Sequence, residues 1–315
     1  MNDSLDFLGR LALPVIAAPM LRVSGIELVS AACRHGVIGA FPTANCRSLD
    51  ELDAWMSRLD DEARTGGETV APYCPNLIMR RDPAKVRAEV DLIARHRARL
   101  VITSVGSPSS VVPVLHDGGC RVFADVASLH HAERAIASGV DGLVLLTAGA
   151  GGHTGWANPF AFVRAVRRVF DGPIVLAGGM ADGVALRAAI TLGCNLGIMG
   201  TRFIATQESL ASEGYRQMLC DAGIDDVLLT RAFTGLPASF LRQSAERLGI
   251  DVNTLDESTS VEEARRRWGG GSEGAASQRW TDIWSGGHTV SAVREVQSVE
   301  ALVRELRAEY ESAAR

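Results

Sequence analysis

Short apolar runs recur along roughly the first two thirds of the chain, each followed by a glycine-rich or polar segment and then a helical pattern. Runs of Val, Ile and Leu predict strands covered on both faces, which need no alternation with polar residues. The expected strands are 15–18, 37–41, 69–72, 100–103, 121–124, 142–146, 174–177 and 196–199. Helices are expected between them, among them 83–96, 129–138 and 160–170, where apolar residues return close to the helical period of about 3.6 residues.

Eight strand–helix units within about 200 residues predict an α/β fold, a (β/α)8 TIM barrel whose ligands bind at the C-terminal ends of the strands. We therefore expect residues 1–206 to form the barrel core. Residues 207–315 are expected to form a mainly helical and irregular extension packed on it, in the same compact unit. Its composition marks 269–274 as a loop, and a last helix is expected after Ser298, with Val299, Leu302, Val303 and Leu306 on one face.

Composition and charge narrow the classes of partner. The net charge of −5 argues against nucleic acid, because binding to phosphates needs a concentrated basic face. The six cysteines are scattered without the spacing of metal ligands, so we expect neither a metal site nor a disulfide framework. No apolar run reaches membrane-spanning length and no basic leader opens the chain, which favours a cytoplasmic protein with no membrane partner. A homodimer is the base-rate expectation for its oligomeric state.

Candidate chemistry begins with the segment AGAGGHTG at 148–155, directly after the sixth expected strand. Only glycine tolerates both a positive φ and a close approach of the backbone to a ligand. His153 is the single titratable side chain of this segment, and imidazole is suited to proton transfer near neutral pH. A flexible loop with a solvated histidine is the alternative for this segment alone. A Rossmann site is disfavoured, because that fold places its glycine turn after the first strand.

Further signals stand at the ends of other expected strands. Glycines follow the seventh and eighth strands, where barrels often bind phosphate with backbone N–H groups and a helix N-terminus. The first strand ends on a Pro-Met pair, whose thioether can contact a planar ligand, and an asparagine follows the third. These candidates are Pro19, Met20, Asn76, Gly178, Gly179, Gly200 and Thr201.

Four motifs occur in order: AAPM at 17–20, GGH at 151–153, AGGMADG at 177–183 and MGTRF at 199–203. As a set they resemble the nitronate monooxygenase (formerly 2-nitropropane dioxygenase) family of FMN-dependent barrels over about residues 10–210, and more loosely through 233–237 and 280–287. The resemblance implies that FMN is bound by Ala18, Pro19, Met20, Asn76, Gly151, Gly152, Gly178, Gly179, Met199, Gly200 and Thr201.

The same resemblance implies that His153 is the catalytic base. It implies oxidation of a small substrate, an alkyl nitronate or a nitroalkane, with O2 to a carbonyl compound and nitrite. His288, after Gly286-Gly287, is a looser candidate for the flavin phosphate. Family members commonly carry a lysine at the end of the fifth strand, whereas this chain has Asp125, whose negative charge would oppose an anionic reduced flavin.

Two other functions stay open on the sequence. An NAD(P)H-dependent flavin reductase of quinones or enoyl thioesters would use the same FMN loops, so the glycines do not separate it from a nitronate oxidase. A non-catalytic flavin-binding protein would hold FMN without redox turnover. The loops around Trp156 and Phe233 are expected to shape the substrate pocket.

Overall fold

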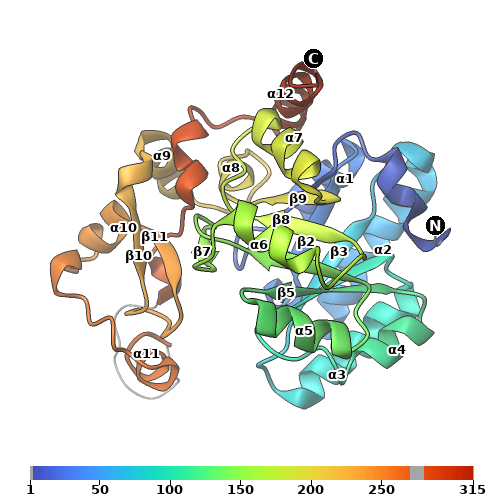
Figure 1. Cartoon of the computed structure of the whole chain (residues 1–315), viewed down its shortest axis with the longest axis horizontal. Coiled ribbons are helices and arrows are strands. Elements are labelled where there is room, and N and C mark those ends of the chain that lie inside the picture. Colours follow the sequence, from blue (N-terminus) through green and yellow to red (C-terminus); the bar gives the residue numbers. More distant parts are fainter. Residues whose placement is uncertain (1–2, 270–279, 315) are drawn as a thin grey trace.

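The computed structural model describes residues 3–269 and 280–314, and its centre is a closed barrel of eight parallel strands (Figure 1). Their order around the barrel is β1-β2-β3-β4-β5-β6-β8-β9, so each strand pairs with the next barrel strand along the chain. The strands are β1 (Val15–Ala17), β2 (Ile38–Pro42), β3 (Tyr73–Ile78), β4 (Leu100–Ser104), β5 (Arg121–Val126), β6 (Gly142–Leu146), β8 (Ile174–Ala177) and β9 (Leu196–Met199). The expected (β/α)8 fold is confirmed.

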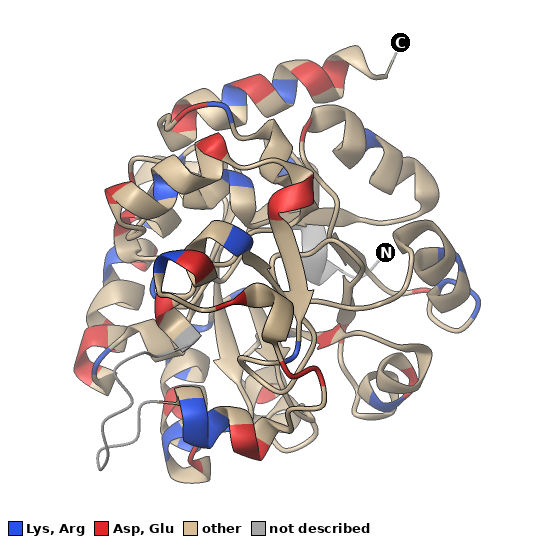
Figure 2. Cartoon of the chain, turned by 90° about the vertical axis from the view of Figure 1, so that its left-hand side faces the viewer, with Lys and Arg blue, Asp and Glu red and all other residues tan. Residues whose placement is uncertain are grey.

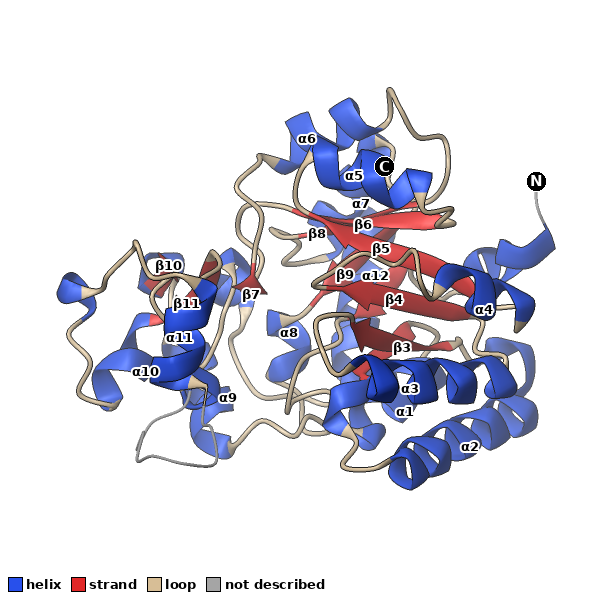
Figure 3. Ribbon diagram, turned by 90° about the horizontal axis from the view of Figure 1, so that it is seen from below, coloured by secondary structure: helices blue, strands red, loops and turns tan. Residues whose placement is uncertain are grey.

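Helices follow the strands and cover the outside of the barrel (Figure 3). They are α1 (Ile26–Arg34), α2 (Leu49–Gly66), α3 (Pro83–His96), α4 (Val112–Asp117), α5 (Leu129–Ala137), α6 (Pro159–Val166), α7 (Gly183–Leu192) and α8 (Thr201–Ile204). Short 3-10 segments are η1 (Asp3–Arg10), η2 (Thr43–Asn45), η3 (Gly67–Thr69), η4 (Ile224–Asp226), η5 (Val252–Thr254), η6 (Trp280–Asp282) and η7 (His288–Ala292). Side-chain caps mark where several of these helices begin. Asn158 caps α6 and Asp182 caps α7, each by accepting hydrogen bonds from backbone N–H groups of the first turn.

The prediction of the third strand at residues 69–72 is wrong. Those residues end η3 and lead into the strand, which runs from Tyr73 to Ile78. The strand contains Pro75, a residue usually absent from central strands, and this obscured the pattern. Asn76 therefore lies inside β3 and not after it. The helix expected over 160–170 is also shorter, because α6 ends at Val166.

Side chains alternate between the inside of the barrel and the helices outside it. The inner cluster includes Ile16, Ile38, Cys74, Ile102, Phe123, Val144, Val175 and Leu196. Side chains two positions further along a strand share its face. On β3, β4 and β5 these are Asn76, Ser104 and Asp125, which place three polar groups on the inner surface at the C-terminal end of the barrel.

The part of the chain after the barrel adds further helices and, together with the loop after β6, forms a second, smaller sheet. The sheet has the order β10-β11-β7, and β11 pairs antiparallel with both of its neighbours. These elements are β7 (Gly152–His153), β10 (Val227–Thr230), β11 (Ala238–Leu241), α9 (Glu213–Asp221), α10 (Arg242–Arg247), α11 (Val261–Trp268) and α12 (Val299–Ser312). Figure 1 shows α9, α10, α11 and this sheet together on one side of the barrel.

The last helix, α12, begins after the Ser298 cap as expected and buries Val299, Leu302, Val303 and Leu306. It contacts α7 and α1, and its exposed face carries both acidic and basic residues (Figure 2). The loop expected at 269–274 falls almost wholly outside the described residues. Within the described part of the chain, no helix is long and apolar enough to cross a membrane.

Candidate functional site

The end of β1 meets the end of β9 at the C-terminal rim of the barrel. The N–H of Ala18 donates to the carbonyl of Met199 at 2.9 Å. A Cβ built on Gly200 would lie 3.4 Å from the Sδ of Met20, so the thioether and this glycine are neighbours. The backbone N–H of Met20 donates to the Ser24 hydroxyl at 3.0 Å, which fixes the turn after Pro19. The structure thus brings these predicted residues together.

The loop after β8 contains two glycines with different roles. Gly178 and Gly179 both have positive φ, +122° and +75°, a region that favours glycine. A Cβ on Gly178 would lie 2.5 Å from the Thr147 Oγ1, so this glycine is required by packing against the residue that follows β6. A Cβ on Gly179 would meet nothing within 4 Å. Gly179 therefore presents its backbone to open space at the rim.

The glycine loop after β6 is covered by a segment distant in sequence, residues 286–288. A Cβ on Gly151 would lie 2.8 Å from the backbone nitrogen of Gly287, whose N–H donates to the Thr201 Oγ1 at 3.0 Å. The N–H of His288 donates to the carbonyl of Gly149 at 3.0 Å. Gly151 is thus required by this backbone contact. Thr201 accepts one hydrogen bond here and keeps its own hydroxyl proton to donate.

His153 lies on a strand and not in an irregular loop. It forms β7 with Gly152 and pairs with Ala238 of β11. Thr154 reinforces this position, because its N–H donates to Pro237 and its hydroxyl donates to Thr147 at 2.8 Å. The imidazole is exposed to solvent, yet desolvation lowers its pKa. Water therefore reaches this residue, although the neighbouring protein atoms disfavour its charged form.

Asn76 is buried and its amide is held in place on the inner surface. Its Nδ2 lies 3.1 Å from the Ser104 Oγ and donates to the carbonyl of Ile102 at 3.3 Å. The Ser104 hydroxyl can instead donate to the amide oxygen of Asn76, at 3.2 Å. The pair therefore forms a neutral, oriented polar patch at the barrel mouth.

Asp125 adds a carboxyl group to the same inner surface. Burial raises its pKa to about 7, and a hydrogen bond from the N–H of Val105 opposes that rise. Val105 follows β4 and has a φ of +54°, a left-handed conformation that is rare for a β-branched residue. No pattern in the sequence indicated this backbone conformation.

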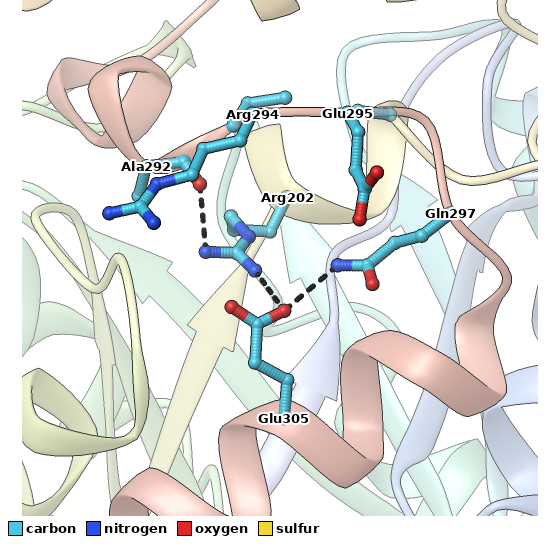
Figure 4. A pocket seen from close by; sticks show the side chains of 8 residues that line it. Arg202, Ala292, Arg294, Glu295, Gln297 and Glu305 are labelled. Atoms are coloured by element: carbon cyan, nitrogen blue, oxygen red, sulfur yellow. Dashed lines mark hydrogen bonds and ion pairs between the residues drawn. The ribbon is translucent and has the colours of Figure 1, made fainter.

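The helix expected at the phosphate position, α8, has only 4 residues, so its dipole is small. Its buried Arg202 points toward Glu305 of α12 (Figure 4). The guanidinium donates to the carbonyl of Ala292 at 3.0 Å and pairs with Glu305 at 3.0 Å. The side-chain amide of Gln297 donates to the same carboxylate oxygen at 3.0 Å. These contacts anchor the segment after η7 against the base of the site.

Within the described ranges, no group of three or more His, Cys, Asp or Glu side chains could hold a metal ion. The candidate features of the site are instead the glycine-rich strand ends, the imidazole of His153 and a small set of polar groups at the barrel mouth. The closed parallel barrel defines a TIM-barrel protein, and the candidate residues gather at its C-terminal face, where ligands of such barrels bind. Residues 68–309 match the family model for nitronate monooxygenase, which is more than half of the chain. The chain belongs to the nitronate monooxygenase family.

Individual relatives carry different names. The chain is 29% identical over 235 residues to a (3aS,4S,5R,7aS)-5-hydroxy-7a-methyl-1-oxo-octahydro-1H-indene-4-carboxyl-CoA dehydrogenase of Mycobacterium tuberculosis, covering 73% of this chain and 63% of that relative. It is 27% identical over 289 residues to a nitronate monooxygenase of Paraburkholderia phytofirmans, covering 78% of each. Among solved structures, FabK from Thermotoga maritima superposes with a TM-score of 0.81 at 23% identity, covering 100% of this chain and 97% of that one. This last likeness shows the shared fold.

Proposed function

We propose that this chain is an FMN-dependent monooxygenase that oxidises alkyl nitronates with O2 to a carbonyl compound and nitrite. The observation that carries the proposal is the position of His153, which the pairing of β7 with β11 holds beside the glycine-lined rim. Membership of the nitronate monooxygenase family supports the same reaction class. Neutral nitroalkanes are the second substrate class, and they require a base.

The residues of the rim fit a flavin mononucleotide. Gly179, with its left-handed backbone and open space, leaves room for a ligand that lies against the main chain. Thr201 offers a hydroxyl proton to a phosphate, and Met20 beside Gly200 offers a polarisable surface to a planar ring. The Asn76 amide adds a fixed polar group. FMN, when bound, would supply the two-electron redox chemistry, while the protein supplies placement and a base.

His153 acts in this proposal as the proton acceptor. Because desolvation lowers its pKa, the imidazole is neutral at pH 7 and one ring nitrogen can accept a proton. From a neutral nitroalkane it takes the proton on the carbon that bears the nitro group, and the electron pair of that C–H bond passes to the nitro group to give the nitronate. A substrate already in the nitronate form needs no such step, and His153 then positions it.

A second candidate is an NAD(P)H-dependent flavin reductase of thioesters, and the carboxyl-CoA compound in the name of the Mycobacterium tuberculosis relative supports only the thioester part of it. Two exposed aromatic side chains follow His153 in sequence: Trp156 is 84% exposed and Phe160 is 62% exposed. An apolar acyl group would find surface there. This candidate differs from the first in its electron donor, which makes the two separable.

The deciding measurement is the flavin absorbance of the purified protein, followed anaerobically after separate additions of a nitronate and of NAD(P)H. Bleaching by the nitronate alone supports nitronate oxidation. Bleaching only by NAD(P)H transfers the proposal to the reductase. Binding of FMN without bleaching by either donor favours a non-catalytic flavoprotein. A protein that binds no FMN even after reconstitution contradicts all three flavin functions.

His153→Asn tests the base. We expect FMN to remain bound and turnover of neutral nitroalkanes to fall by about 10²–10⁴-fold, while preformed nitronates lose much less. His130→Asn, an exposed change on α5, is the matched control. Equal rates for wild type and His153→Asn on both substrate forms would exclude this role.

A further inference from the structure

Asp125 brings a carboxyl group to the inner surface of the barrel mouth. Phe123 belongs to the inner apolar cluster, and Asp125, two positions further along β5, shares its face. In the register of the barrel Asp125 lies opposite Val144 of β6, and its neighbour Ala124 lies opposite Thr103 of β4. The carboxyl therefore reaches the end of the barrel at which the proposed flavin lies.

No charged residue of the neighbouring strands balances the charge of this carboxyl. The strands on either side, β4 (LVITS) and β6 (GLVLL), contain no charged residue. Asn76 and Ser104, on the same inner surface, are neutral. Two further titratable groups, Cys74 on the inner surface and His153 on β7, are neutral at pH 7. Burial raises the pKa of the Cys74 thiol on β3, and desolvation lowers the pKa of His153.

Among the described residues, one backbone N–H acts on the carboxyl. The N–H of Val105 hydrogen-bonds to it, and Val105 adopts φ +54° while Gly106 follows at +157°. A left-handed valine is disfavoured, so the chain keeps this geometry against its own backbone preference. A carboxyl group can make several hydrogen bonds, and the donor from Val105 satisfies only one of them.

We propose that Asp125 takes up a proton when the flavin is reduced and so couples flavin reduction to pH. This inference rests on the proposed function, because it requires a flavin in the barrel mouth. Two electrons and one proton convert oxidised flavin to its anionic reduced form. A carboxylate beside that new negative charge is destabilised and binds a second proton, which neutralises it.

The number of protons taken up on flavin reduction depends on whether Asp125 is ionised beforehand. Where Asp125 is ionised before reduction, two electrons and two protons are taken up in total. Where it is already protonated, two electrons and one proton are taken up. The electrons come from the nitronate in the proposed turnover and from dithionite in the test below. The pKa of Asp125, about 7, places the change between these regimes near neutral pH.

The test is the reduction potential of bound FMN, measured by dithionite titration at several pH values between about 5 and about 9, around the pKa of a perturbed carboxyl. Wild type is compared with Asp125→Asn, which keeps the shape and cannot ionise, and with Asp125→Glu, which restores an ionisable group. FMN affinity is measured separately by quenching of flavin fluorescence, and folding by circular dichroism.

We expect wild type and Asp125→Asn to have the same potential at low pH and to diverge as the pH rises above the pKa of Asp125. One extra proton changes the equilibrium tenfold per pH unit, so the wild-type potential falls below that of Asp125→Asn by about 30 mV per pH unit for a two-electron couple. Asp125→Glu should restore a divergence, displaced along the pH axis.

Parallel potential–pH curves for wild type and Asp125→Asn, with FMN bound by both, overturn the inference and leave the proposed function intact. Absence of FMN binding by wild type overturns the proposed function and this inference together. If Asp125→Asn loses FMN, the comparison is made with Asp125→Ser, which also cannot ionise, and a curve parallel to that of wild type then overturns the inference.

Discussion

The hydroxyl oxygen of Thr201 accepts a hydrogen bond from the backbone N–H of Gly287 at 3.0 Å, across 86 positions of sequence. Thr201 follows β9, and Gly287 lies so close to Gly151 that a Cβ on either residue would meet backbone of the other segment. Three segments that carry candidate site residues are thereby fixed to one another: the loop after β6, the start of α8 and residues 286–288. Residues 286–288, far from the barrel strands in sequence, therefore form part of the rim together with the strand ends.

Replacement of Thr201 by valine should weaken this junction. Valine has nearly the same shape but offers no acceptor, so the buried N–H of Gly287 is left without a partner at a cost of about 1–3 kcal/mol. We expect a lower free energy of unfolding in urea and faster loss of bound FMN. Thr201→Ser keeps the oxygen and is the control. A valine variant as stable as the serine variant would contradict the importance of this bond.

The two glycines after β8 should respond differently to alanine. Gly179→Ala introduces a left-handed alanine in open space, so we expect a loss of about 1 kcal/mol of stability and a much larger loss of FMN affinity, because the methyl group enters the proposed cradle. Gly178→Ala adds a clash with Thr147 to the same backbone strain and should destabilise the apoprotein more. Unfolding in urea and flavin fluorescence titration measure the two effects. Unchanged FMN affinity in Gly179→Ala would place the flavin elsewhere.

The activity on neutral nitroalkanes should depend on the ionisation of His153. Only the neutral imidazole accepts a proton, and desolvation lowers its pKa below the usual value of about 6.5. We therefore expect kcat/KM to be constant above that pH and to fall as the pH drops through the lowered pKa. The measurement is made on the Asp125→Asn variant, because burial raises the pKa of Asp125 to about 7, close to the range in which His153 ionises. A profile that still falls after His153→Asn would assign the titration to another group.

The barrel could be predicted because its strands are buried on both faces and their sequences are continuous apolar runs. Where a strand departs from that composition, as YCPNLI does in β3, the prediction failed and placed Asn76 beyond the strand. The glycines at the ends of β8 and β9 could also be found, since barrels bind ligands at those ends. The same rule predicted that Met20 and Gly200, which follow β1 and β9, lie at this end of the barrel, and the structure places them next to each other.

The remaining geometry depends on contacts between distant segments. A strand of 2 residues, β7, exists only because β11 supplies its partner, and no local pattern marks it. The contact between Gly151 and Gly287 is indicated in the sequence only by the pair Gly286-Gly287 before His288. Nothing in the sequence indicated the left-handed conformation of Val105, because valine is among the residues least suited to it.

The pair of Arg202 and Glu305 should contribute more to stability than other ion pairs of α12. Arg202 is buried, and removal of the carboxylate leaves its charge with carbonyl partners only, those of Ala181 and Ala292. We expect Glu305→Ala to lower the free energy of unfolding by about 1–3 kcal/mol, less than a fully buried pair because Glu305 is partly exposed.

Glu311→Ala is the matched control on the same helix. It breaks an exposed ion pair with Arg307 at 2.8 Å, and such pairs are worth about 0.5 kcal/mol or less. Urea unfolding of both variants, with limited proteolysis near α12, gives the comparison. Because Arg202 directly follows Thr201, Glu305→Ala should also weaken FMN binding, whereas Glu311→Ala should not. Equal effects of the two variants on stability and on FMN affinity would show that α12 is held by its apolar face alone.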